Sequence, residues 1–62
     1  MNLYKMKMLG SMPGAHYSYS YLVVAKNISE ATEKATKEMR EVRHLNFVEV
    51  DEVELFAEEI II

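Results

Sequence analysis

The stretch YSYSYLVVAKNISEA, residues 17–31, decides the fold, because the spacing of its apolar residues changes within it. Up to Lys26, aromatic and β-branched residues follow a period of two, which is typical of a β-strand. Asn27 and Glu30 then form the pattern in which an Asn side chain caps a first helical turn and a Glu reaches back to the cap. A strand over residues 16–26 and a helix over residues 28–43 are therefore predicted.

The predicted helix has one apolar stripe, which should pack on a sheet. Its members recur at helical spacing: Ile28, Ala31, Ala35, Met39 and Val42. Because two of them are alanines, we expect the helix to approach the sheet closely over a thin core.

Two further strands are predicted, one on each side of this segment. In residues 2–10, Tyr4, Met6 and Met8 alternate with Lys5 and Lys7, as in a half-buried strand. Turn-forming residues concentrate in the loop expected at 10–14. Residues 46–56 alternate again, and a change of phase near residues 51–52 predicts a β-bulge or a bend.

This order predicts one α+β domain over residues 1–62, a two-layer β-β-α-β fold with the helix on one face of a three-stranded sheet. The last two predicted strands run parallel, so the third lies either beside the second or on the far side of the first. We expect the first strand to be central. Lys5 and Lys7 then lie next to Glu49 and Asp51 on the outward face, where opposite charges are mildly favourable.

Charge divides the chain into a basic start and an acidic end. Residues 1–26 hold three lysines and no acid, whereas residues 46–62 hold six acids and no Lys or Arg, within a net charge of −3. This balance argues against a dedicated duplex-DNA binder. There is no cysteine, no signal-like leader and no run near the ~18 apolar residues that span a bilayer, so we expect a soluble cytoplasmic protein.

No catalytic constellation stands out in the sequence. His16 and His44 are the only histidines, and neither has a partner at metal-ligand spacing. The sequence has no Gly-rich phosphate loop and no calcium-binding loop. We therefore expect that the protein is not an enzyme and binds no cofactor or metal.

Two groups of side chains are candidates for binding a partner: Tyr17, Tyr19, Tyr21, Glu49, Asp51, Glu52 and Glu54. The tyrosines form a period-two ladder that suits a protein interface, a stacking platform for single-stranded nucleic acid, or core packing under the helix. The acids suit a basic protein surface, mimicry of nucleic-acid phosphates, or a solvated face.

Self-association, as a homodimer, is also expected. Both faces of the second predicted strand are apolar, and one of them needs cover beyond the helix. The residues assigned to this contact are Leu22, Val24, Ile60, Ile61 and Ile62.

The junction VAKNISEA, residues 24–31, followed by Lys34 and Ala35, resembles a junction common in small β-β-α-β proteins encoded by phages and prophages. The resemblance covers about a dozen residues and carries over no functional residue. It implies an accessory factor that binds a host or phage protein, including inhibitors of host enzymes and defence systems. We therefore expect a protein-binding factor, and a small single-stranded nucleic-acid binder is the alternative.

Overall fold

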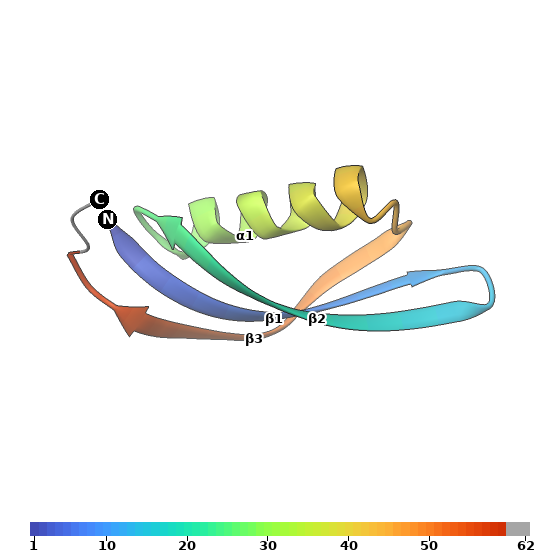
Figure 1. The fold of residues 1–62 in the computed structure, drawn as a ribbon, viewed down its shortest axis with the longest axis horizontal. Coiled ribbons are helices and arrows are strands. Elements are labelled where there is room, and N and C mark those ends of the chain that lie inside the picture. Colours follow the sequence, from blue (N-terminus) through green and yellow to red (C-terminus); the bar gives the residue numbers. More distant parts are fainter. Residues whose placement is uncertain (60–62) are drawn as a thin grey trace.

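A computed structural model of the chain describes residues 1–59. The predicted β-β-α-β fold is confirmed, with one helix along one face of a three-stranded sheet (Figure 1). The elements are β1 (Asn2–Met12), β2 (Ala15–Ala25), the helix α1 (Ile28–Lys37), one π-helical turn η1 (Glu38–Val42) and β3 (Phe47–Ala57).

The strand order is β2-β1-β3, so β1 is central, as predicted. Both outer strands run antiparallel to β1 and hence parallel to each other. The bulge expected near residues 51–52 is confirmed, because Lys7 pairs with Glu52 while the next residue, Met8, pairs with Val50. A second register shift, which skips Phe56, has no counterpart in the prediction.

The core lies between the sheet and the helix and is rich in methionine. Met6, Met8 and Met39 are its largest fully buried side chains. Ala31 and Ala35 face the sheet and are buried, so the helix backbone approaches the strands closely, as the sequence predicted. Methionine suits this shallow space because its unbranched side chain fills irregular gaps.

Asn27 caps α1, as predicted, since its Oδ1 accepts a hydrogen bond of 2.9 Å from the Glu30 backbone N–H. The Glu30 carboxylate lies 3.3 Å from the Lys34 ammonium group, one helical turn onward. This ion pair has the acid four residues before the base, which is the order that stabilises a helix more.

The prediction of a loop over residues 10–14 is wrong in its extent. The strands continue until only Pro13 and Gly14 form the turn, and Gly14 has a φ of +83°. Gly10 lies inside β1 and is buried. It serves close packing, since a Cβ there would overlap the Leu45 side chain and lie 2.8 Å from Met39 Cε.

The prediction that the whole apolar stripe of the helix packs on the sheet is wrong at both ends, because Ile28 and Val42 are exposed. The π-helical turn explains Val42: its wider backbone, seen in the Arg43 N–H bond to the Glu38 carbonyl, rotates later residues relative to an α-helix. Leu45 closes this end of the core instead.

Candidate partner-binding surface

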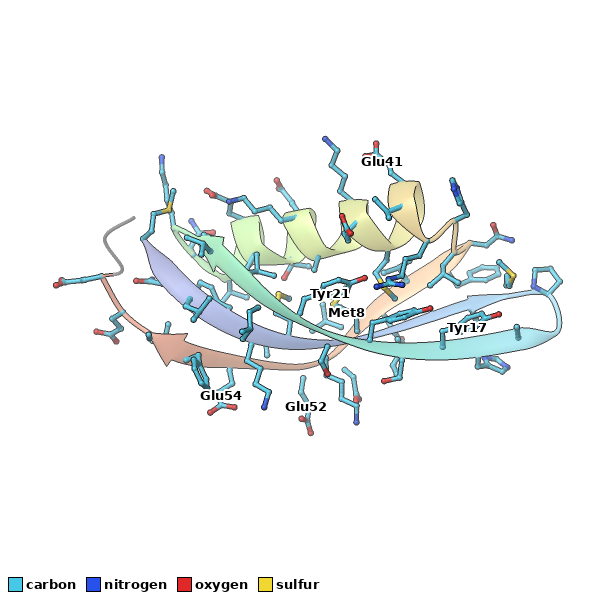
Figure 2. The ribbon with its side chains drawn as sticks, in the orientation of Figure 1. Met8, Tyr17, Tyr21, Glu41, Glu52 and Glu54 are labelled. Carbon is cyan, nitrogen blue, oxygen red and sulfur yellow. The ribbon has the colours of Figure 1, made fainter. Side chains whose placement is uncertain are left out.

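The three tyrosines lie on the helix side of β2. Tyr17 stacks on Tyr19 with ring centroids 6.2 Å apart, and Tyr19 lies 6.5 Å from Tyr21. Their exposure differs, because Tyr17 is 42% exposed near the hairpin tip whereas Tyr19 and Tyr21 are half-buried and pack against the core. Figure 2 shows Tyr21 beneath the helix and Tyr17 out toward the hairpin.

Arg43 covers this ladder from the end of the helical segment. Its guanidinium carbon lies 3.8 Å from the centroid of the Tyr19 ring. Its Nε donates a 2.8 Å hydrogen bond to the Tyr21 hydroxyl, which lies 3.4 Å from Met39 Sδ. The bond to Tyr21 raises the pKa of Arg43 above its ordinary value. Two of the three rings are therefore engaged within the protein.

Sequence reasoning missed this contact with Arg43. From the sequence, Arg43 is only a positive charge near the end of the predicted helix, where it interacts favourably with the helix dipole. A π-helical turn places it over β2, and no periodicity in the sequence indicates that turn.

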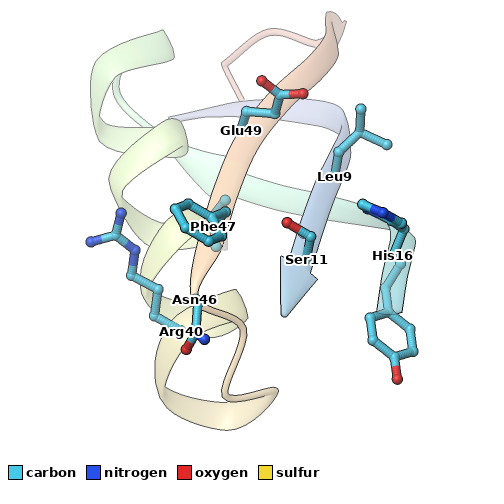
Figure 3. A pocket seen from close by; sticks show the side chains of 10 residues that line it. Leu9, Ser11, His16, Arg40, Asn46, Phe47 and Glu49 are labelled. Carbon is cyan, nitrogen blue, oxygen red and sulfur yellow. The ribbon is translucent and has the colours of Figure 1, made fainter. Parts of the chain in front are cut away.

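An open pocket of about 510 Å³ lies where the hairpin passes the start of β3 (Figure 3). Arg40, His16 and Phe47 are among the residues around it. Phe47 is largely exposed. In residues 1–59 no group of three His, Asp or Glu side chains is placed to hold a metal ion. The acidic and basic residues of its lining are Arg40, His16 and Glu49.

The helix side of β3 has an apolar row, which consists of Val48, Val50, Val53 and Leu55. In register, these residues lie opposite Gly10, Met8, Met6 and Tyr4 of β1, all of which are buried. Val50, Val53 and Leu55 are nevertheless 36%, 37% and 45% exposed. The row thus continues the core beyond the cover that the helix provides.

The opposite side of β3 is acidic. The in-register pairs with β1 are Glu49 with Leu9, Glu52 with Lys7, and Glu54 with Lys5. The expectation that Glu49 lies next to a lysine is therefore wrong, because the register sets Glu49 opposite Leu9. The one-residue bulge at Asp51 then makes Glu52 the in-register partner of Lys7. Asp51, the bulged residue, lies 3.6 Å from the Lys7 ammonium group, as expected. Glu52 and Glu54 point away from the helix (Figure 2).

The two outer edges of the sheet differ. At the β2 edge, the Lys34 ammonium group donates a 2.6 Å hydrogen bond to the Val24 carbonyl oxygen, so a helix residue occupies an edge acceptor. Within residues 1–59, β3 pairs only with β1. The β3 edge therefore presents backbone donors and acceptors between the apolar row and the acidic side.

The structure does not bring the two predicted binding groups together. The tyrosines lie on the helix side of β2, whereas the four acids lie on the other side of the sheet along β3. A flat partner surface cannot contact both groups at once. The apolar row, the β3 edge and the acids do form one continuous surface, which we call the β3 surface.

The residues assigned to self-association are only partly placed. Leu22 is 63% exposed and Val24 half-buried, opposite Lys5 and Leu3 on the outward side. Ile60, Ile61 and Ile62 lie outside the described residues. Homodimer formation stays a prediction.

The chain matches no protein-family model, no curated protein and no solved structure. Among the described residues, no helix has the length and apolar character needed to cross a membrane.

Proposed function

We propose that the protein is a non-enzymatic accessory or inhibitory factor that binds another protein through its β3 surface. One observation carries the proposal: the apolar row of β3 is more than a third exposed at three positions, although it lies directly beside the buried residues of β1. A partner that covers this row extends an existing core, which gives it apolar contact without any rearrangement of the sheet.

The acids on the other side of β3 favour a basic partner. Charges of this kind guide association and reject wrong partners more than they add affinity. A host or defence protein that binds nucleic acid has such a surface, and acidic mimicry of phosphates is one way to occupy it. The phage-like junction of residues 24–31 agrees with this role.

The test uses matched substitutions on the two outer strands. Leu55→Thr removes apolar surface from the row on β3, and Leu22→Thr makes the same change on the opposite side of β2 at an exposed position. A photo-crosslinking residue at Val53 identifies the partner in a lysate, and the purified pair is then measured by titration. We expect at least about tenfold weaker binding for Leu55→Thr and little change for Leu22→Thr. Equal binding by both variants would overturn the proposal.

The second candidate is single-stranded nucleic-acid binding by the tyrosine ladder. The observation in its favour is Arg43 over Tyr19, because it adds a cation in direct contact with the ladder to Lys5, Lys7 and Lys26, the cations that the sequence offers. Because Arg43 contacts Tyr19 and Tyr21, Tyr17 is the most exposed ring of the ladder on which a base could stack. The geometry therefore supports protein binding better.

A labelled oligonucleotide separates these two candidates. Binding that falls steeply with salt and is lost in Tyr17→Ala supports the nucleic-acid function. Absence of binding at low salt removes it.

A further inference from the structure

We propose that the partner binds as an extended basic strand that pairs with the free edge of β3 and becomes the fourth strand of the sheet. Its side chains alternate between apolar residues and Lys or Arg. This inference rests on the proposed function, because it names the chemistry of the partner at the same β3 surface.

The edge of β3 gives the strand its backbone partners. β3 has 11 residues, and within residues 1–59 it pairs on one side only. An exposed edge of this length is a template for pairing with another chain. The corresponding edge of β2 is less available, because Lys34 binds the Val24 carbonyl oxygen there.

The two sides of β3 set the alternation of the incoming strand. Between the two register shifts, Glu52-Val53-Glu54-Leu55 alternates strictly, with the acids outward and the apolar residues on the helix side. Side chains of a paired strand lie beside residues on the same side of the sheet. Apolar residues of the incoming strand therefore extend the row of Val53 and Leu55, and its other residues lie beside Glu52 and Glu54.

The charge of the outward side determines what those other residues are. The four β3 acids share their side of the sheet with two lysines of β1, and within residues 1–59 one ion pair joins the two groups, between Lys7 and Asp51 at 3.6 Å. An excess of negative charge is left along the edge. Lys or Arg beside Glu52 and Glu54 offsets this excess, whereas Asp or Glu increases it.

A second copy of this chain fits the same edge poorly. Consider an antiparallel register in which Val50 of one copy lies opposite Val53 of the other. In this register Glu49 lies opposite Glu54, and the two-fold symmetry of a dimer makes this contact occur twice. Like charges directly opposite each other are destabilising. The acids that attract a basic strand thus oppose edge-to-edge pairing of two copies.

The experiment titrates the full chain with a synthetic peptide, acetyl-KVKVKVKVK-amide, at low ionic strength. Three control peptides accompany it. One has Glu in place of every Lys, and the other two are N-methylated on alternate backbone nitrogens, one at the Lys residues and one at the Val residues. We expect the basic peptide to bind, the glutamate peptide to bind at least about tenfold more weakly, and N-methylation in one register to abolish binding.

Matched protein variants test the contribution of the acids. The triple variant E49Q/E52Q/E54Q neutralises three of the four β3 acids and leaves Asp51, which pairs with Lys7. The variant E33Q/E38Q/E41Q makes the same charge change on the helical segment. We expect about tenfold weaker peptide binding for the first variant and a smaller loss for the second. Absence of binding by the basic peptide, equal binding of both N-methylated registers, or equal loss in both variants would overturn the inference.

The two proposals fail in different ways. If Leu55→Thr weakens the natural partner but the basic peptide does not bind, the β3 surface is correct and the strand chemistry is wrong. If Leu55→Thr leaves the natural partner unaffected, the proposed function itself is wrong.

Discussion

Met6 of β1 and Val53 of β3 lie directly opposite each other in the sheet, yet Met6 is fully buried and Val53 is 37% exposed. The difference agrees with the position of α1, which contacts β2 more extensively than β3 and whose Lys34 donates a hydrogen bond to the Val24 carbonyl oxygen. The core is therefore asymmetric, and its β3 side is the one open to a partner.

Truncation at these two positions should have very different costs. Met6→Ala leaves a cavity in the core and should lower the free energy of unfolding by about 2–5 kcal/mol. Val53→Ala removes a side chain that is already partly in water, so we expect about 1 kcal/mol or less. Urea unfolding followed by circular dichroism measures both. A Val53→Ala cost equal to that of Met6→Ala would contradict the asymmetric core.

Gly10 should be required for packing beneath Leu45. A methyl group at Gly10 overlaps the Leu45 side chain and crowds Met39, so Gly10→Ala should cost about 1–3 kcal/mol. The cost should fall when Leu45 is also replaced by Ala, because the overlap is then removed. Denaturant unfolding of the four proteins in this double-mutant cycle measures the coupling, and a coupling of zero would contradict the close approach.

Gly14 is the matched control, since no atom lies within 4 Å of a Cβ built there. Gly14 has a φ of +83°, which a residue with a Cβ adopts only with backbone strain. Gly14→Ala should therefore lower the free energy of unfolding by about 1 kcal/mol, and this loss should not change when Leu45 is replaced.

Arg43 should show the ring contact with Tyr19 in solution. A guanidinium 3.8 Å from the ring centroid places nearby side-chain protons in the ring current, so NMR should find upfield-shifted Arg43 δ protons. An Arg side chain stays charged in this range, and the Tyr21 hydrogen bond raises the pKa of Arg43 further, so the shift should be constant from about pH 5 to pH 9. Arg43→Lys should lose both the shift and the Nε bond. Unshifted protons in the unaltered protein would contradict the contact.

Neutralising the β3 acids should promote self-association. E49Q/E52Q/E54Q removes three of the four negative charges that oppose pairing of two β3 edges, so it should form more dimer than the unaltered chain at equal concentration. The helix variant E33Q/E38Q/E41Q controls for net charge. Sedimentation velocity measures both, and identical behaviour of the two variants would show that the β3 acids do not control this edge.

The architecture was predictable because each element has a local signal. The change from period two to helical spacing at Asn27 locates the strand and the helix, and the lysines of β1 and the acids of β3 indicate a central β1. The bulge at Asp51 was visible as a change of phase. The strand, helix and bulge signals are local in the sequence, whereas the central place of β1 was indicated by charges that lie far apart in the sequence.

The candidate surface was only partly predictable, because it depends on the lateral position of the helix over the sheet. The alternation of Val53 and Leu55 indicates a buried side, but no pattern shows that α1 leaves it partly open. Contact between Arg43 and Tyr19 depends on a π-helical turn, and burial of Gly10 depends on Leu45, which follows that turn. Each is a long-range consequence of packing.

The most direct test of the account is the ¹⁵N amide spectrum of the full chain during titration with the alternating Lys-Val peptide. We expect the largest shifts, together with slowed hydrogen exchange, at β3 residues 52–55, and little change at Tyr17, Tyr19 and Tyr21. Shifts confined to the tyrosines and Arg43, or no shifts at saturating peptide, would contradict the assignment of β3 as the binding edge.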